Sequence, residues 1–186
     1  VKDILKSGWL THGKYTAAFE NEFKSFTNSK FSTTVSSCTA GLHLACLALN
    51  IKKGDEVIVP AMTHTATSHA VEYTGAKAVF ADIKYPEGNI DVASLRQKIT
   101  KKTKAIIIVH MAGYPCDMDQ IVKICKKNKI FLIEDCAHAV GSKYDNQHLG
   151  NFGICGVFSF YPTKQITTGE GGMVISNNKN FYKKLK

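Results

Sequence analysis

The residue that most directly suggests chemistry in this 186-residue chain is Lys164. It follows the predicted strand 156–160 and precedes a small, polar loop, Thr167–Gly172. A lysine in a partly desolvated pocket has a lowered pKa and can form a Schiff base with an aldehyde. Ser159 could add a hydroxyl for a phosphate, and the glycines let a ligand approach the backbone closely. The alternative is that Lys164 is an ordinary surface lysine.

A second candidate pair comes directly after the apolar run Ile130–Glu134. Asp135 is the first residue after this run, and His138 follows three residues later. A buried carboxylate is costly unless it is paired or hydrogen-bonded. A cationic nitrogen on a bound heterocycle is one partner that would keep Asp135 ionised. The alternative is that Asp135 caps a helix and His138 is a partly exposed structural residue.

Two further stretches place polar groups after predicted strands. Ser36–Gly41 leads into a helix, so its free backbone N–H groups and hydroxyls suit an anion such as phosphate, although Ser37 or Thr39 could simply cap the helix. His64, after the strand that stops at Pro60, could stack on a planar cofactor or be structural. No glycine-rich dinucleotide or Walker motif is present, and the seven histidines lack metal-ligand spacing, so we expect no metal.

These four stretches fit one chemistry better together than any of them does alone. An aldehyde-bearing, phosphorylated pyridine needs a lysine for its aldehyde, a carboxylate for its ring nitrogen, a flat group over its face and a helix terminus for its phosphate. Lys164, Asp135, His64 and Ser36–Gly41 supply one of each.

The elements that must position these residues follow a β-α-β-α rhythm. Such a rhythm predicts an α/β fold with three layers, α/β/α, around a mostly parallel sheet, and ligands bind such sheets at the carboxyl ends of the strands. The predicted strands are 33–37, 56–59, 76–81, 105–109, 130–134, 156–160 and 173–176. The predicted helices are 15–27, 39–49, 65–73, 91–99 (with Asp91 as N-cap), 117–127 and one starting at 179.

Composition limits the class of protein. Apolar residues make up 44% and charged residues 21%, as in a globular chain, and no apolar run is long enough to span a membrane. The net charge of +9 comes from dispersed lysines, which favours a solvated surface over a nucleic-acid site. The six cysteines are scattered and there is no secretion signal, so we expect reduced thiols and a cytoplasmic location.

The chain resembles the sugar aminotransferases of the DegT/DnrJ/EryC1/StrS family, a branch of the fold-type I enzymes that depend on pyridoxal phosphate. The resemblance runs through nearly the whole chain. It rests on G-W-L-T-H-G at 8–13, F-E-N-E-F at 19–23, S-S-C-T-A-G-L-H-L-A at 36–45, G-D-E-V-I-V-P-A-M-T-H-T-A-T at 54–67, V-H-M-A-G-Y-P-C-D-M-D at 109–119, I-E-D-C-A-H-A-V-G-S at 133–142 and F-S-F-Y-P-T-K-Q-I-T-T-G-E-G-G at 158–172.

The resemblance implies roles at the reacting end of the cofactor. Lys164 is implied to bind the cofactor aldehyde and to shuttle the proton between substrate and cofactor. Asp135 is implied to keep the ring nitrogen protonated, and His138 takes the position near the phenolic oxygen. The family's usual Asn before the lysine is Thr163 here.

It also implies the remaining contacts. Thr39, Ala40 (through its backbone N–H) and Ser159 are implied to bind the phosphate. His64 stands where the family more often places a Phe, Tyr or Trp over the pyridine. Thr11, in the loop at 8–13, is the candidate on the substrate side.

The activity implied is transamination of a nucleotide-linked keto sugar, with an amino acid, expected to be glutamate, as donor. The family implies a homodimer with shared active sites. It also has a smaller C-terminal domain, so residues 1–186 are expected to be most of the cofactor-binding domain of a longer chain. Two alternatives stay open. One is a same-fold dehydratase or aminobenzoate-type synthase, of which the dehydratase with a histidine at the lysine position is disfavoured by Lys164. The other is a non-catalytic regulator.

Overall fold

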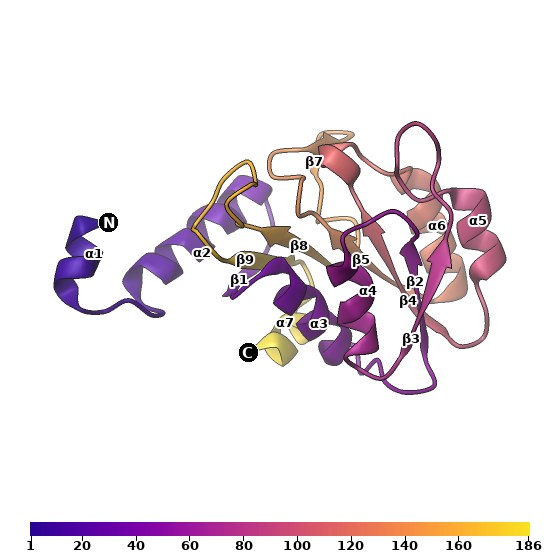
Figure 1. The fold of residues 1–186 in the computed structure, drawn as a ribbon, viewed down its shortest axis with the longest axis horizontal. Helices are drawn as coiled ribbons and strands as arrows, with labels where there is room; N and C mark the ends of the chain where they lie inside the picture. Colours follow the sequence, from indigo (N-terminus) through magenta and orange to yellow (C-terminus); the bar gives the residue numbers. More distant parts are fainter.

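The computed structural model describes residues 1–186 and contains a seven-stranded sheet in the order β1-β9-β8-β5-β4-β2-β3 (Figure 1). Only β9 is antiparallel to its neighbours, β1 and β8. The mostly parallel sheet is therefore confirmed. The strands are β1 (Phe31–Val35), β2 (Glu56–Pro60), β3 (Lys77–Ala81), β4 (Thr103–Val109), β5 (Phe131–Asp135), β8 (Cys155–Ser159) and β9 (Gly172–Ser176).

Helices cover both faces of this sheet, which confirms the three-layer α/β/α architecture (Figure 1). One face carries α3 (Cys38–Ala48), α4 (Thr65–Glu72) and α7 (Lys179–Leu185). The other carries α2 (Lys14–Thr27), α5 (Val92–Lys98) and α6 (Met118–Asn128). None of the helices combines the length and the hydropathy that a membrane-spanning segment requires.

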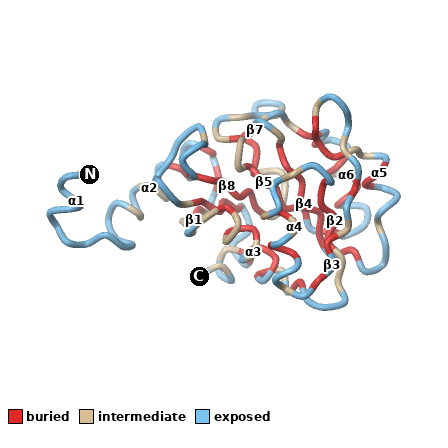
Figure 2. Tube along the Cα trace, viewed as in Figure 1, coloured by how far each residue is buried: buried red, intermediate tan, exposed pale blue.

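The central strands β4, β5 and β8 are mostly apolar because both of their faces are buried (Figure 2). Side chains alternate between the faces of a strand. In β4, Ala105 and Ile107 pack toward α3, whereas Ile106 and Ile108 pack toward α5 and α6.

Polar side chains fix the starts of the helices close to where the sequence predicts them. The Asp91 carboxylate accepts the N–H groups of Ala93 and Ser94 at the start of α5, which confirms the predicted cap. The Asp117 carboxylate accepts from Gln120 in the same way at α6.

The sequence does not indicate two short elements, the β6–β7 ribbon (Lys143–Tyr144 and Gln147–His148) and a 3-10 turn at Met111–Gly113. The N-terminal residues, which have a helical character in the sequence, form helix α1 (Lys2–Ser7). The helix α1 projects away from the sheet (Figure 1). The spacing of Phe19, Phe23 and Phe26 in the sequence predicts one apolar face for α2, but the buried face is shorter: Phe23 packs on Phe158 and Phe160, whereas Phe26 is 58% exposed.

Candidate active site

The six strands other than β9 point the same way, so their carboxyl ends meet at one edge of the sheet. Asp135 ends β5, Ser159 ends β8, and the segments carrying Lys164 and His64 follow β8 and β2. The topology therefore brings the four predicted stretches to one edge, as expected for a ligand site in an α/β sheet.

Asp135 is the best-defined member of the site. Its carboxylate is buried and accepts hydrogen bonds from the Thr67 hydroxyl (3.0 Å, Oδ2) and the Ala137 backbone N–H (3.1 Å, Oδ1), with the Cys38 thiol 3.7 Å from Oδ1. Burial raises the pKa of Asp135, while the bonds from Ala137 and Thr67 lower it. Neither ion pair of the structure involves Asp135. Neutral donors thus hold a buried carboxylate that suits a cationic N–H partner.

Lys164 lies half-buried in the turn that follows β8, where its backbone N–H donates to the Tyr161 carbonyl (3.0 Å). The next side chain, Gln165, donates to the His138 carbonyl and so ties this turn to the segment after β5. Burial lowers the pKa of His138, and the nearby charge of Lys164 lowers it further. The structure therefore brings Lys164, His138 and Asp135 together.

Two residues of the loop between β8 and β9 donate hydrogen bonds to the same backbone carbonyl, that of Phe160. Phe160 O accepts from the Thr168 N–H (3.1 Å) and from the Thr167 hydroxyl (2.9 Å), and the Phe160 N–H donates to Gly171 O (2.9 Å). The small polar residues of this loop thus hold the turn with Lys164 against the sheet edge.

The predicted phosphate-binding groups lie around the start of α3, with one difference. The Ala40 N–H donates to the Ser37 hydroxyl (3.1 Å), so Ser37 caps the helix and Ala40 is not free. The backbone N–H groups of Cys38 and Thr39 have no acceptor in the chain. Ser159 is buried, and its hydroxyl only accepts, from Tyr161 N–H at 3.4 Å. Two backbone donors and the Thr39 and Ser159 hydroxyls remain available for an anion.

Gly172 explains how the strand ends come so close to this helix start. A Cβ at Gly172 would lie 2.8 Å from Cys38 N, Ser37 C and Phe158 O. Only glycine therefore allows β9 to pass between the end of β8 and the first turn of α3.

His64 and Thr11 occupy more exposed positions. His64 caps α4, where its Nδ1 accepts the Ala66 N–H at 3.1 Å, so a neutral ring carries its proton on Nε2. His64 follows the carboxyl end of β2, which places it at the same edge of the sheet as Asp135. Thr11 borders a hollow of about 900 Å³ beside Glu170 that neither Asp135 nor Lys164 lines. The chain alone does not bring Thr11 to the Asp135–Lys164 set.

A second buried cluster lies behind Asp135. His110, Glu134 and Cys136 place potential metal-ligand atoms within 4.8 Å of one another. However, Glu134 already accepts from the N–H groups of Gly150, Phe152 and Gly153 (2.7 Å each) and contacts His110 Nε2 at 3.2 Å. These bonds satisfy the carboxylate and give the cluster a structural role.

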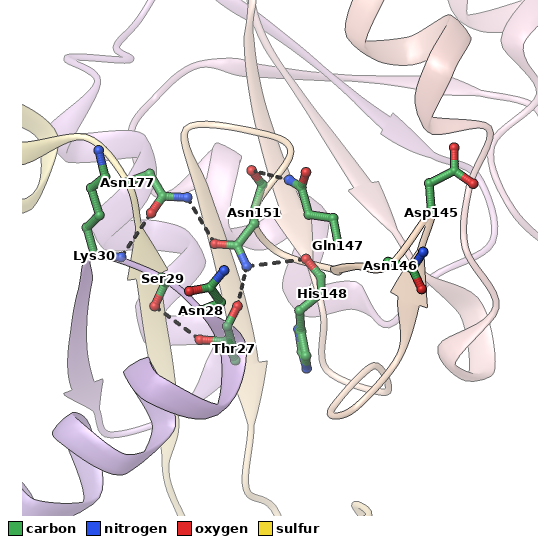
Figure 3. A pocket seen from close by; sticks show the side chains of 10 residues that line it. All are labelled: Thr27, Asn28, Ser29, Lys30, Asp145, Asn146, Gln147, His148, Asn151 and Asn177. Carbon is green, nitrogen blue, oxygen red and sulfur yellow. Dashed lines mark hydrogen bonds between the residues drawn. The ribbon is translucent and has the colours of Figure 1, made fainter.

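A polar hollow of about 680 Å³ lies at the opposite edge of the sheet, where β1 starts and β9 ends (Figure 3). Its side chains bond to one another and to the backbone: Asn177 donates to Asn151, and Asn151 donates to the carbonyls of Thr27 and His148. None of the predicted site residues lines it.

Sequence reasoning missed three residues of the site, namely Cys38, Thr63 and Thr67. Thr67 lies 68 residues before Asp135 and Cys38 lies 97 residues before it. The only local signal was the four-residue spacing of Thr63 and Thr67 at a helix start, where their hydroxyls bond at 2.8 Å.

Comparison with known proteins finds a family match that covers the whole chain. The model of the DegT/DnrJ/EryC1/StrS aminotransferase family matches residues 1–186. GDP-perosamine synthase of Escherichia coli O157:H7 is 49% identical over 183 residues, which are 98% of this chain and 50% of that protein. The chain thus spans about half the length of the curated relatives it matches.

Solved structures agree with this match. An aminotransferase from Psychrobacter cryohalolentis superimposes with a TM-score of 0.96 at 39% identity over 99% of this chain and 47% of that one. A putative sugar aminotransferase from Streptococcus pneumoniae, solved in its PLP form, gives 0.93 at 35% identity over 98% and 52%, and its PMP form gives 0.94. A GDP-4-keto-6-deoxymannose-3-dehydratase also superimposes, with 0.93 at 35% identity over 99% and 49%.

Proposed function

The chain belongs to the DegT/DnrJ/EryC1/StrS aminotransferase family, and from this premise we propose that the protein transfers an amino group from an amino acid to a nucleotide-linked keto sugar. Pyridoxal phosphate is the cofactor of this family. The observation that carries the proposal is the buried Asp135 carboxylate, which has no ion-pair partner and lies at the same carboxyl edge of the sheet that the Lys164 turn follows. The overall exchange yields a 2-oxo acid and an amino sugar.

The residues present fit pyridoxal phosphate. The Asp135 carboxylate would receive the protonated ring nitrogen, and its neutral partners leave that role open. The Thr39 and Ser159 hydroxyls and the free N–H groups at the start of α3 would bind the phosphate. The Ala40 N–H joins them only if Ser37 releases it. When bound, the cofactor supplies the electron sink that acidifies the substrate carbon.

Lys164 is the proposed catalytic residue. Its amine would hold the cofactor aldehyde and, once displaced by the donor amine, would move the proton between the substrate carbon and the cofactor carbon. The segment after β5, to which Gln165 ties the Lys164 turn, gives the amine a fixed base. His138, whose lowered pKa keeps it neutral near pH 7, would contact the phenolic oxygen without adding a second positive charge. His64 would cover the ring, and Thr11 would contact the substrate.

We further propose that residues 1–186 are the cofactor-binding part of a longer chain, because they span about half of the curated relatives. The rest of that chain and a second subunit would complete the sugar site in a homodimer. Six free, buried thiols support a reducing compartment such as the cytoplasm.

Dehydration of the same class of keto sugar is the second candidate, because one solved neighbour is a sugar 3-dehydratase. Because this chain has Lys164 where those dehydratases carry a histidine, the dehydratase activity is disfavoured. We propose glutamate as the amino donor, and the substrate panel described below is needed to identify the sugar.

The experiment uses the full-length protein with pyridoxal phosphate, glutamate and a panel of nucleotide-linked keto sugars. We expect 2-oxoglutarate and an amino sugar in equal amounts. Lys164→Ala should abolish turnover, whereas the exposed control Lys179→Ala should leave it unchanged. A deoxygenated sugar without an amino group would favour dehydration, and turnover by Lys164→Ala would refute the role of this lysine.

A further inference from the structure

Thr67, on the first turn of α4, is fully buried although threonine is polar. Its hydroxyl is 3.0 Å from Asp135 Oδ2 and 2.8 Å from the Thr63 hydroxyl. These contacts join the segment after β2, which also carries His64, to the end of β5.

The direction of this hydroxyl relay follows from the chemistry of its end point. An ionised carboxylate only accepts hydrogen bonds, so the single proton of Thr67 goes to Asp135. Thr67 must then accept from Thr63, and the chain Thr63 to Thr67 to Asp135 is polarised toward the carboxylate. Such chains strengthen their members in a low-dielectric interior.

The other carboxylate oxygen is held from different elements. Asp135 Oδ1 accepts from the Ala137 N–H (3.1 Å) and faces the Cys38 thiol (3.7 Å). Both oxygens therefore have a partner, and Thr67 is the sole hydrogen-bond donor to Oδ2 within the chain. Without it, Oδ2 would be a buried charged atom with no donor, which is costly.

The groups that titrate near Asp135 are few. They are the Cys38 and Cys136 thiols and the His138 imidazole, and the charge of the Lys164 amine acts on Cys38 and His138. Burial raises the pKa of both thiols well above the usual range and lowers that of His138, so all three are neutral near pH 7.

We propose that Thr67 is a positioning residue, backed by Thr63, that holds the Asp135 carboxylate ionised and aimed at the ring nitrogen of the cofactor. This inference rests on the proposed function. It assigns to the start of α4 a second task besides carrying His64. The same relay would fix the His64 segment relative to the carboxylate.

The test uses full-length protein and three variants: Thr67→Val, which keeps the shape and removes the donor, Thr67→Ser, which restores it, and Ser68→Ala. The last is a matched control, because the Ser68 hydroxyl bonds only to its own helix, at Thr65 O (3.0 Å). Pyridoxal phosphate affinity is measured by fluorescence quenching, and the pH midpoint of the cofactor absorbance is measured by titration.

Thr67→Val should weaken pyridoxal phosphate binding about tenfold, the effect of losing one hydrogen bond to a charged group. A less firmly protonated ring nitrogen withdraws less charge from the lysine-bound end, so the absorbance midpoint should move to higher pH. In turnover, kcat should fall more than KM rises. Thr67→Ser should restore all three, and Ser68→Ala should match wild type.

Wild-type affinity together with a wild-type absorbance midpoint in Thr67→Val would overturn the inference. A weaker affinity that Thr67→Ser fails to restore would also overturn it, because it would indicate loss of packing. If Thr67→Val does not fold, Thr63→Val removes the donor to Thr67 at a less buried position, and an unchanged midpoint there contradicts the relay. If wild type itself does not bind pyridoxal phosphate, the proposed function fails instead.

Discussion

Glu134 and Asp135 are neighbours at the end of β5, but their carboxylates lie on opposite faces of the sheet. Asp135 faces α3 and α4, where Cys38 and Thr67 contact it, and Glu134 faces His110 and the loop before β8. The alternation of side chains along a strand separates the two acids by the width of the sheet. Asp135 is therefore available to a ligand, whereas the hydrogen bonds of Glu134 hold the loop before β8.

Replacing Glu134 by Gln should destabilise the protein without affecting the site directly. The carboxylate accepts three backbone N–H groups, and the amide of Gln would turn a donor toward at least one of them. We expect a loss of about 2–4 kcal/mol in the free energy of unfolding. Denaturant unfolding of the full-length protein measures this loss, and an unchanged midpoint would show that the cluster does not hold the loop.

Asp135→Asn should have the opposite effect: little change in stability and a large loss of turnover. It removes a buried charge. The amide oxygen of Asn can still accept from the Ala137 N–H, and its NH2 group can donate to the Thr67 hydroxyl, which can accept as well as donate, so stability should change by less than about 1 kcal/mol. Turnover should fall about 100-fold or more, because the ring nitrogen loses its anionic partner. Parallel unfolding and kinetic measurements check both halves. Turnover close to wild type would remove Asp135 from the site.

Gly172→Ala should displace the start of α3. The added Cβ would lie 2.8 Å from the backbone of Cys38 and of Phe158, and backbone atoms cannot move aside cheaply. We expect a loss of about 2 kcal/mol or more and weaker phosphate binding. The control is Gly13→Ala, where the Cβ would meet only the exposed Trp9 side chain, at 3.1 Å. Equal stability of the two variants would contradict the close approach.

We expect His148 to make the free energy of unfolding depend on pH under mildly acidic conditions. Burial lowers its pKa, and its Nε2 accepts the Gly141 N–H at 3.0 Å, a bond that protonation of Nε2 breaks. The unfolded chain binds a proton near the ordinary value of 6.5 while the folded ring resists it. Stability is therefore full above this value and falls as the pH drops below it.

His148→Gln should reduce the loss of unfolding free energy at acidic pH, because Gln does not titrate and its side-chain oxygen can accept the Gly141 N–H. Unfolding free energies measured between neutral and mildly acidic pH check the slope. An identical slope in wild type and variant would assign the acid sensitivity to other groups, such as His138, whose pKa burial also lowers.

The sequence predicts the parts of this structure that are local. Apolar runs mark the strands, and Asp91 starts a helix because its carboxylate reaches N–H groups only two and three residues away. Strand-end residues such as Lys164 and Asp135 could be grouped because parallel strands share one carboxyl edge. The Thr67–Asp135 and Cys38–Asp135 contacts depend on how α3 and α4 pack on β5, and no local pattern encodes that. The exposure of Phe26 likewise depends on where the sheet ends beneath α2.

The role of Lys164 can be tested by identifying the residue to which the cofactor is bound. Full-length protein is incubated with pyridoxal phosphate, reduced with borohydride, digested and mapped by mass spectrometry. We predict one phosphopyridoxyl group per chain, on Lys164, and a wild-type-like fold without this label in Lys164→Ala. A stable label on another lysine, or a folded wild-type protein that takes up no label, would contradict it.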